Sequence, residues 1–543
     1  MAGRTSAQFR PAATTMPGTK QCWECRKRRL VCDFGRPSCI KCRDRGVQCP
    51  GYDHKPLRWV APGETRSKKR KAQQPSVGQS AVTRIPRVDL KDAGATDLIQ
   101  AIDYYNRVIC PDLLATNKRA CENPFFAPPA AAAHILPAIA EMVVSTALGH
   151  RILQSSHCST SDRVALATKL QHHRGLAIRL MADVLATDGM RTSDEMLACV
   201  LVFLFAEVRI TPSDFGEHQV TDWSYSQIQQ SISSSWRQHA DAAWTIINSR
   251  GGLGDLIHSR APFCHLFRYF TIIDVFGATT SPPLHLGRAR RQLDVLPVLP
   301  TLYGDGLQTC VPCPPELLGH VILVNHFRAD LRGLAGEQKK NHHLFAAARA
   351  TLQEICNFSV HKWVDDTVLP SLLMDDAEEP RRHAGLDSSQ TMARRWIWLA
   401  LTSAFKSAMA IYCIEAIFDG RTFEAEDDDR TCNALTSFFD VRMFHKETLR
   451  TNLQTVASDE RGKLRKFTIW PLVVLGVVTD PSDEAAKRFI TGELKWISAN
   501  VGISSPLIAT EVLGKIWQTS RTRTDKKDVR WDDLFEKPYI FAL

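Results

Sequence analysis

Six cysteines lie close together near the start of the chain, in the segment CWECRKRRLVCDFGRPSCIKCRDRGVQC. Their spacing is C-x2-C-x6-C-x6-C-x2-C-x6-C, so one unit, C-x2-C-x6-C, occurs twice. Cysteines three residues apart fall on one side of a helical turn, where they can offer two sulfurs to one metal ion. The spacing therefore predicts a metal site with these ligands: Cys22, Cys25, Cys32, Cys39, Cys42 and Cys49.

The number of thiols is compatible with two zinc ions. A structural zinc ion takes four ligands, so six thiolates either fill one site and leave two over, or serve two ions through two bridging sulfurs. The twofold repeat favours the shared arrangement, because each half would hold one zinc ion and lend one sulfur to the other. The first twenty residues carry no apolar run typical of a signal peptide. We therefore expect a reducing compartment, in which dense cysteines bind metal rather than form disulfides.

The segment resembles the fungal zinc binuclear cluster (Zn2Cys6) family of transcription factors. It shares the six-cysteine spacing, the basic run Arg26-Lys27-Arg28-Arg29 after the second cysteine, and Pro37 two residues before the fourth. The resemblance implies two zinc ions bridged by Cys22 and Cys39. It also implies that Arg29 reads a CGG-type triplet in the major groove with help from Arg28, while Arg26 and Lys41 meet phosphates. An arginine offers two donors to guanine O6 and N7.

Two positions depart from the family pattern. The family often has Lys immediately before the third cysteine, where this chain has Val31, and often has Lys at the reading position, where this chain has Arg29. These differences affect the fine base preference rather than the cluster. The alternative is a zinc-stabilised module that binds RNA or protein without reading DNA sequence. The basic run inside the first loop favours DNA.

The positive charge of the chain is concentrated at the same end. Residues 1–71 hold 18 Lys and Arg against 5 Asp and Glu, whereas the remainder holds 50 against 53. Such clustering is typical of a protein that binds a polyanion.

Beyond the cysteines, residues 53–95 are rich in Pro, Gly, Ser and charge, and lack apolar heptads. We expect a flexible basic linker that forms no coiled coil, so any homodimer would form elsewhere. Its basic run could be a nuclear import signal or a phosphate-contacting tail: Lys68, Lys69, Arg70 and Lys71.

The region from residue 96 to the end has the apolar pattern of helices. The segment HADAAWTIINSRGGL spaces Ala240, Ala243 and Ile247 along one helical face and then ends in two glycines, as a helix C-terminus should. The order of this segment, FTIIDVFGATTSPP and WPLVVLGVV resembles the fungal-specific transcription factor regulatory domain. That resemblance implies regulation through a coactivator or corepressor, or through an effector that no residue here identifies.

Other functions find less support in the residues. The chain has no P-loop, no G-x-S-x-G and no H-E-x-x-H, so we do not expect an enzyme. The apolar stretch MLACVLVFLFAEV is shorter than the roughly 20 residues that span a bilayer, and it predicts a buried core helix in a protein without a membrane partner.

These observations predict a mostly α-helical nuclear protein that binds double-stranded DNA. We expect a disordered tail at residues 1–20, a zinc module at 21–52, the linker at 53–95 and an α-helical regulatory domain at 96–543. The function expected is regulation of RNA polymerase II promoters, and the family resemblance points to a metabolic or biosynthetic gene set.

Overall fold

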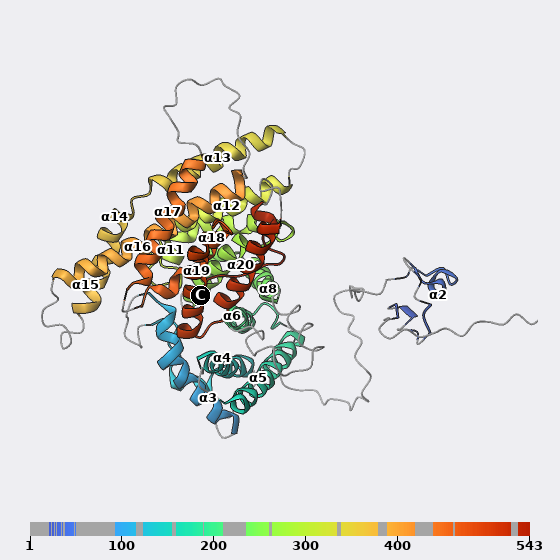
Figure 1. Cartoon of the computed structure of the whole chain (residues 1–543). Helices are drawn as coiled ribbons and strands as arrows, with labels where there is room; N and C mark the ends of the chain where they lie inside the picture. Colours follow the sequence, from blue (N-terminus) through green and yellow to red (C-terminus); the bar gives the residue numbers. More distant parts are fainter. Residues whose placement is uncertain are drawn as a thin grey trace, which may run out of the picture. The chain divides into compact units, whose positions relative to one another are not determined.

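A computed structural model describes most of the chain. The described residues are 21–49 apart from positions 23, 26, 27, 29, 34, 36, 37 and 48, and then 93–115, 123–154, 159–187, 189–209, 235–259, 263–333, 338–377, 388–418, 438–459, 462–522 and 530–542. The chain divides into two compact units, residues 1–83 and 84–543. Every regular element in the described parts of both units is helical (Figure 1), which confirms the predicted fold class.

In the described part of the small unit a short α-helix, α2 (Ile40–Arg43), begins directly after Cys39. The backbone N–H of Val47 donates to Cys42 O at 3.0 Å, and Gly46 takes a positive φ of 63°. This is the left-handed turn that commonly ends a helix, and glycine adopts it without a Cβ clash. The turn sends the chain back toward Cys49.

The large unit is built from many packed helices. Its longer α-helices are α3 (Ala93–Tyr104), α4 (Pro137–Gln154), α5 (Thr160–Ala186), α6 (Asp194–Arg209), α8 (Ser235–Ser249), α10 (Cys264–Thr279), α12 (Pro315–Gly333), α13 (Gln338–Asn357), α15 (Leu369–Ala377), α16 (Ser388–Cys413), α17 (Phe438–Ala457), α18 (Ile469–Val477), α19 (Glu484–Val501) and α20 (Ser505–Thr522). Other helical segments, mostly short, lie between them: η1 (Tyr105–Ile109), η2 (Cys110–Leu113), η4 (Pro129–Ala133), α9 (Leu253–Ser259), η7 (Pro283–Val298), α11 (Leu299–Tyr303), α14 (Val360–Trp363), η8 (Val364–Val368), η9 (Ile414–Phe418), η10 (Arg465–Thr468) and η11 (Trp531–Asp533).

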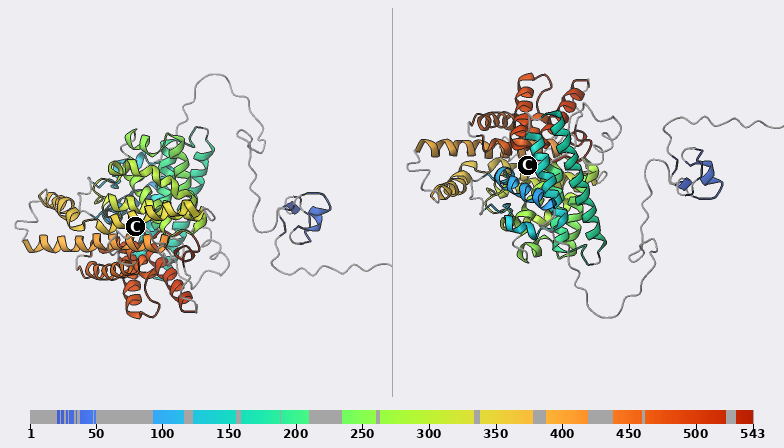
Figure 2. Two further views of the ribbon diagram at one scale, coloured as in Figure 1. Left: turned by 90° about the horizontal axis from the view of Figure 1, so that it is seen from above. Right: turned by 90° about the horizontal axis from the view of Figure 1, so that it is seen from below.

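Two helices form the centre of the large unit because they are apolar on all sides. In α10 a continuous run from Tyr269 to Thr279 is buried, and α18 is buried from Ile469 to Gly476. The rings of Phe276 and Trp470 meet edge to face with centroids 5.0 Å apart. A helix without a polar face must be covered all round. The views from above and below show helices stacked on several sides of this unit (Figure 2).

The helix ends follow the local sequence. The side chain of Ser159 accepts from the backbone N–H of Asp162 at the start of α5, and Asp483 does the same for Ala486 at the start of α19. The prediction for α8 is confirmed: Ala240, Ala243 and Ile247 are buried, and both glycines that follow have positive φ. The N–H of Gly252 donates to Ile247 O at 3.0 Å, which closes the turn.

A buried polar network attaches the last described segment to this core. Arg328 of α12 is fully buried, and its Nε donates to Asp532 Oδ1 at 2.6 Å. The other nitrogens of Arg328 donate to the backbone carbonyls of Ala278 and Thr279, the last two residues of α10, and of Ser281 just beyond it. Nearby, Trp531 Nε1 donates to Thr279 O at 2.7 Å. The segment 530–542 is therefore part of the core.

Two strongly apolar stretches lie inside the fold. The predicted core helix is α6, whose residues Met196, Leu201 and Leu204 are buried. One helix among the described residues, Gln390–Phe418, is long and apolar enough to cross a bilayer by length and composition alone. Of its most apolar window, 83% is buried inside the large unit, as in the core helix of a globular domain.

Candidate metal centre and nucleic-acid interface

The six cysteine sulfurs form two overlapping groups of four. One group holds Cys22, Cys25, Cys32 and Cys39, and the other holds Cys22, Cys39, Cys42 and Cys49. Within each group all the sulfurs lie within 4.8 Å of one another. Cys22 and Cys39 belong to both groups, so the two halves of the repeat share one sulfur from each half.

The distances between the sulfurs fit metal coordination rather than disulfide bonds. The separations are 3.6 Å for Cys22–Cys39, 3.8 Å for Cys22–Cys42 and 3.7 Å for Cys25–Cys39. A disulfide would need about 2.05 Å. Zinc–sulfur bonds of about 2.3 Å in a tetrahedron place neighbouring sulfurs about 3.8 Å apart. The donor set therefore fits two zinc ions, each with four sulfurs.

Burial disfavours the thiolate form of three of these cysteines, Cys22, Cys25 and Cys42. Cys22 and Cys39 are completely buried, and Cys25 is 2% exposed. Burial, followed by the neighbouring sulfurs, raises the pKa of Cys25 to about 12, and burial also raises the pKa values of Cys22 and Cys42. A module this small, built around six cysteines, cannot bury the apolar surface that stabilises an ordinary core. Zinc, when bound, supplies the positive charge that stabilises their thiolates, and so couples folding to metal.

A short turn positions the sulfurs within each half of the module, and Asp33 links the two halves. The N–H of Cys25 points at Cys22 Sγ at 3.4 Å, which closes the first C-x2-C turn. In the second half the N–H of Cys42 donates to Cys39 O at 3.1 Å. Asp33 follows the third cysteine, and hydrogen bonds from the backbone N–H groups of Ile40 and Lys41 hold the pKa of its carboxyl below its usual range.

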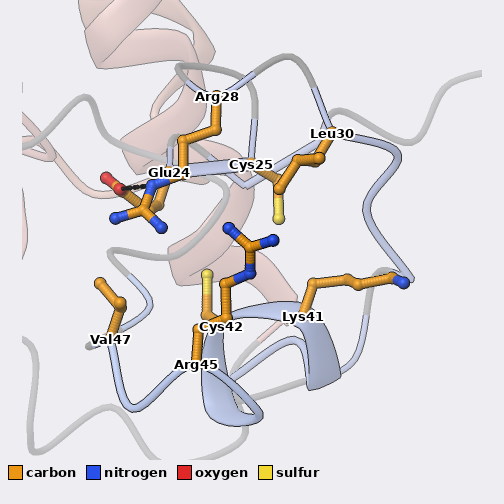
Figure 3. A pocket seen from close by; sticks show the side chains of 8 residues that line it. All are labelled: Glu24, Cys25, Arg28, Leu30, Lys41, Cys42, Arg45 and Val47. Atoms are coloured by element: carbon orange, nitrogen blue, oxygen red, sulfur yellow. Dashed lines mark ion pairs between the residues drawn. The ribbon is translucent and has the colours of Figure 1, made fainter.

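A narrow cleft beside the sulfurs carries three basic side chains. Arg28 lies on one wall, and Lys41 and Arg45 come from α2 and the turn after it, with the Arg45 guanidinium reaching into the space between the walls (Figure 3). The Nε of Arg28 pairs with Glu24 Oε1 at 2.6 Å, one helical turn earlier. All three cations are exposed. These three cations make this face of the module attractive to an anion such as a DNA phosphate.

The structure places only some of the predicted contact residues. Arg28 and Lys41 line the same cleft, as their assignment to one surface requires. Arg26, Arg29 and the run Lys68, Lys69, Arg70 and Lys71 lie outside the described residues. Arg45 was missed by sequence reasoning. Its position four residues after Lys41, which puts the two on one side of a helical turn, was the signal that could have revealed it.

Other residues that could suggest chemistry have structural partners. Cys313 lies in a buried loop with its Sγ 3.5 Å from Tyr303 Oη, and burial raises its pKa to about 12. His173 lies on α5 with Nδ1 2.6 Å from Glu141 Oε2 of α4. Among the described residues, the two sulfur groups of the small unit are the clusters that could hold a metal ion.

Comparison with protein families gives two matches that together span most of the chain. Residues 20–58 match the fungal Zn(2)-Cys(6) binuclear cluster domain, and residues 100–542 match the fungal specific transcription factor domain. The first match covers the cysteine module and assigns zinc as its cofactor. The second covers nearly all of the large helical unit.

Comparison with characterised proteins gives one match over the full length and several over the cysteine module. A phomenoic acid biosynthesis cluster-specific transcriptional regulator of Leptosphaeria maculans is 24% identical over 564 aligned positions, which cover 99% of this chain and 92% of that protein. The arginine metabolism regulation protein II of Saccharomyces cerevisiae is 46% identical over 41 residues, 8% of this chain and 4% of that protein. A pestheic acid cluster transcriptional regulator 3 of Pestalotiopsis fici is 44% identical over 43 residues, 8% of this chain and 7% of that protein.

No solved structure matches the chain significantly. The fold is therefore supported by its own packing and by the family match to residues 100–542. Two overlapping four-sulfur groups and a helical domain that matches over residues 100–542 agree with the expected zinc cluster and regulatory domain. The chain belongs to the fungal-specific transcription factors that carry a Zn(2)-Cys(6) binuclear cluster.

Proposed function

We propose that this protein binds promoter DNA in a sequence-specific manner through its zinc module. The observation that carries the proposal is the pair of four-sulfur groups, which share Cys22 and Cys39 and lie against the basic cleft. In this assignment all six clustered cysteines bind zinc, and Cys22 and Cys39 bridge the two ions. The metal holds the two halves of the module at a fixed separation, so that basic side chains from both halves face one DNA duplex.

The basic side chains divide into base-reading and phosphate-binding groups. Arg29, aided by Arg28, reads the guanines of a CGG-type triplet, because a guanidinium has the two-donor fork that fits guanine O6 and N7. Glu24 pairs with Arg28 through Nε, so this ion pair does not use the two terminal nitrogens of the fork. Arg26 and Lys41 bind phosphates and set the register of the module on the duplex.

The rest of the chain connects this reader to regulation. We assign residues 1–20 to a tail, 21–52 to the reader, 53–95 to a basic linker and 96–543 to the regulatory domain; the division into compact units near residue 83 supports a boundary in this region. The run Lys68–Lys71 directs import into the nucleus. The large unit contacts a coactivator or corepressor and has no enzymatic role, and any homodimer forms without a coiled coil in the linker.

The relatives indicate which genes are controlled. The regulator that matches over the full length is named for a phomenoic acid biosynthesis cluster, and a second relative is named for a pestheic acid cluster. We infer that this protein regulates a biosynthetic gene set through RNA polymerase II promoters.

Competition binding tests the DNA-reading role directly. The full-length zinc-loaded protein is bound to a labelled CGG-containing duplex and challenged with unlabelled CGG or scrambled duplex of the same length, at one fixed salt concentration. We expect the CGG duplex to compete at least tenfold better, since a wrong base pair in a specific site costs about 1–3 kcal/mol. Equal competition would refute sequence reading and would favour a module that binds RNA or protein.

A further inference from the structure

Asp33 joins the two halves of the zinc module through its carboxylate. It follows Cys32, the last cysteine of the first half, and is separated from α2 of the second half by a six-residue loop. Its Oδ2 accepts from the N–H of Ile40 at 2.9 Å and its Oδ1 from the N–H of Lys41 at 3.3 Å. Both oxygens are thus used by the first turn of α2.

This contact replaces the helix cap that α2 lacks. Cys39 precedes α2, but its side chain makes no capping hydrogen bond and is instead a zinc ligand candidate. The first N–H groups of any helix need an acceptor from outside the helix. Asp33 supplies that acceptor, and its negative charge also suits the positive end of the helix.

Gly35, two residues after Asp33, lies close to the same carboxylate. A Cβ at Gly35 would lie 3.1 Å from Asp33 Oδ2 and 3.3 Å from Ser38 O. Both distances are tighter than ordinary van der Waals contact. Gly35, which has no Cβ, can therefore lie close to the Asp33 carboxylate and to the carbonyl of Ser38.

We propose that Asp33 is a positioning residue for DNA binding that acts through Lys41. The carboxylate holds the backbone of Lys41 at the start of α2, and so fixes where the Lys41 side chain leaves the helix to line the edge of the cleft (Figure 3). Zinc alone fixes the sulfurs of Cys39 and Cys42 but leaves the N–H groups of Ile40 and Lys41 without the acceptor that Asp33 provides. This inference rests on the proposed function. It assigns to an acidic residue, Asp33, a role that strengthens binding to negatively charged DNA.

The sign of the effect separates positioning from simple electrostatics. Removing a negative charge from a DNA-binding surface should strengthen binding, because repulsion of the phosphates falls. If Asp33 positions Lys41, Asp33→Asn and Asp33→Ala should instead weaken binding. Asp44 offers a matched control, because it is an exposed acidic residue at the other end of the same helix.

The experiment compares full-length Asp33→Asn, Asp33→Ala and Asp44→Asn with the unchanged protein. DNA affinity is measured with the CGG-containing duplex at fixed salt, and the zinc content of each sample is determined. We expect Asp33→Asn to keep two zinc ions and lose affinity about threefold to tenfold, a loss of the order of one weakened phosphate contact. Asp33→Ala should lose more, and Asp44→Asn should bind equally or more tightly. Loss of zinc from Asp33→Asn, or binding as tight as that of Asp44→Asn, would overturn the positioning role.

A double-mutant cycle with Lys41→Ala tests whether Asp33 acts through Lys41. The effect of Asp33→Asn should largely disappear when Lys41 is already Ala, because the side chain that it positions is gone. Additive losses would contradict the inference. If the unchanged protein shows no preference for any duplex, the proposed function itself fails, whereas a sequence-specific protein that is indifferent to Asp33→Asn refutes only this inference.

Discussion

At the scale of single residues, the shared sulfurs decide how the module holds its metal. Cys22 and Cys39 belong to both four-sulfur groups, whereas Cys49 belongs to one. A ligand that serves both ions is needed by both, and a terminal ligand by one. The same six cysteines therefore divide into two classes that mutation can distinguish.

Replacing a bridging cysteine should release both zinc ions. For Cys39→Ala we expect zinc to fall from two ions per chain to none, because each tetrahedral site loses one of its four ligands. The matched control is Cys49→Ala, which leaves the group around Cys25 and Cys32 complete and should retain more zinc. Zinc is measured by elemental analysis of the purified full-length proteins. Two zinc ions in Cys39→Ala would show that the bridging assignment is wrong.

At the residue scale, the spacing of the cysteines carries enough information to predict a zinc cluster. The repeated C-x2-C-x6-C unit predicted the sulfur set, and the structure brings all six sulfurs into two groups. The contribution of Arg45 to the cleft was not predicted, because it depends on how the turn after α2 folds. The hydrogen bonds from α2 to Asp33 were also beyond the sequence, since acidic residues in loops usually face solvent.

At the scale of elements, the end of α10 is the junction of the large unit. Thr279 accepts from Arg328, Trp470 and Trp531, which lie far apart in the sequence. A buried ion pair lies close by on α10 itself, where Arg237 Nη1 is 3.1 Å from Asp274 Oδ1. Breaking one partner of a buried charged pair leaves the other charge without compensation, which is costly.

The buried pair of Arg328 and Asp532 should be important for stability. We expect Asp532→Ala to lower the free energy of unfolding by about 3–5 kcal/mol, because it strands the Arg328 charge among carbonyls. The neighbouring exposed residue supplies the control: Asp533→Ala should change stability by less than about 0.5 kcal/mol. Chemical denaturation followed by circular dichroism measures both. Equal midpoints for the two variants would show that this pair does not attach the last segment to the core.

The elements themselves were largely predictable, but their pairing was not. The helix at 235–249 and its glycine end follow from apolar spacing and from the need for positive φ after the last turn. Arg328 and Asp532 are 204 residues apart, and no local pattern indicates that a buried arginine meets a carboxylate near the end of the chain. Long-range polar pairs depend on the complete packing of the core.

At the scale of the whole molecule, metal and regulation belong to separate units. The sulfur groups lie in the unit of residues 1–83, and the large core lies in the unit of residues 84–543. Within the described residues, the large unit has its own hydrophobic core centred on α10 and α18. Zinc should thus govern the folding of the small unit and leave the large one intact.

Removing zinc should abolish DNA binding without melting the helical unit. After treatment of the full-length protein with a strong chelator, we expect loss of duplex binding and less than about a tenth of the helical circular dichroism signal to change, since small zinc modules depend on metal to fold. Adding zinc back under reducing conditions should restore binding. A large loss of helical signal on chelation would mean that zinc also supports the large unit.

Selection from a randomised duplex library, with zinc counted on the same full-length sample, tests the central claim most directly. The claim is that a two-zinc module built on Cys22 and Cys39 reads DNA sequence. It predicts two zinc ions per chain and strong enrichment of a G/C-rich triplet, single or paired according to the number of modules that bind. One zinc ion or none, or a selected pool with no enriched sequence, would contradict it.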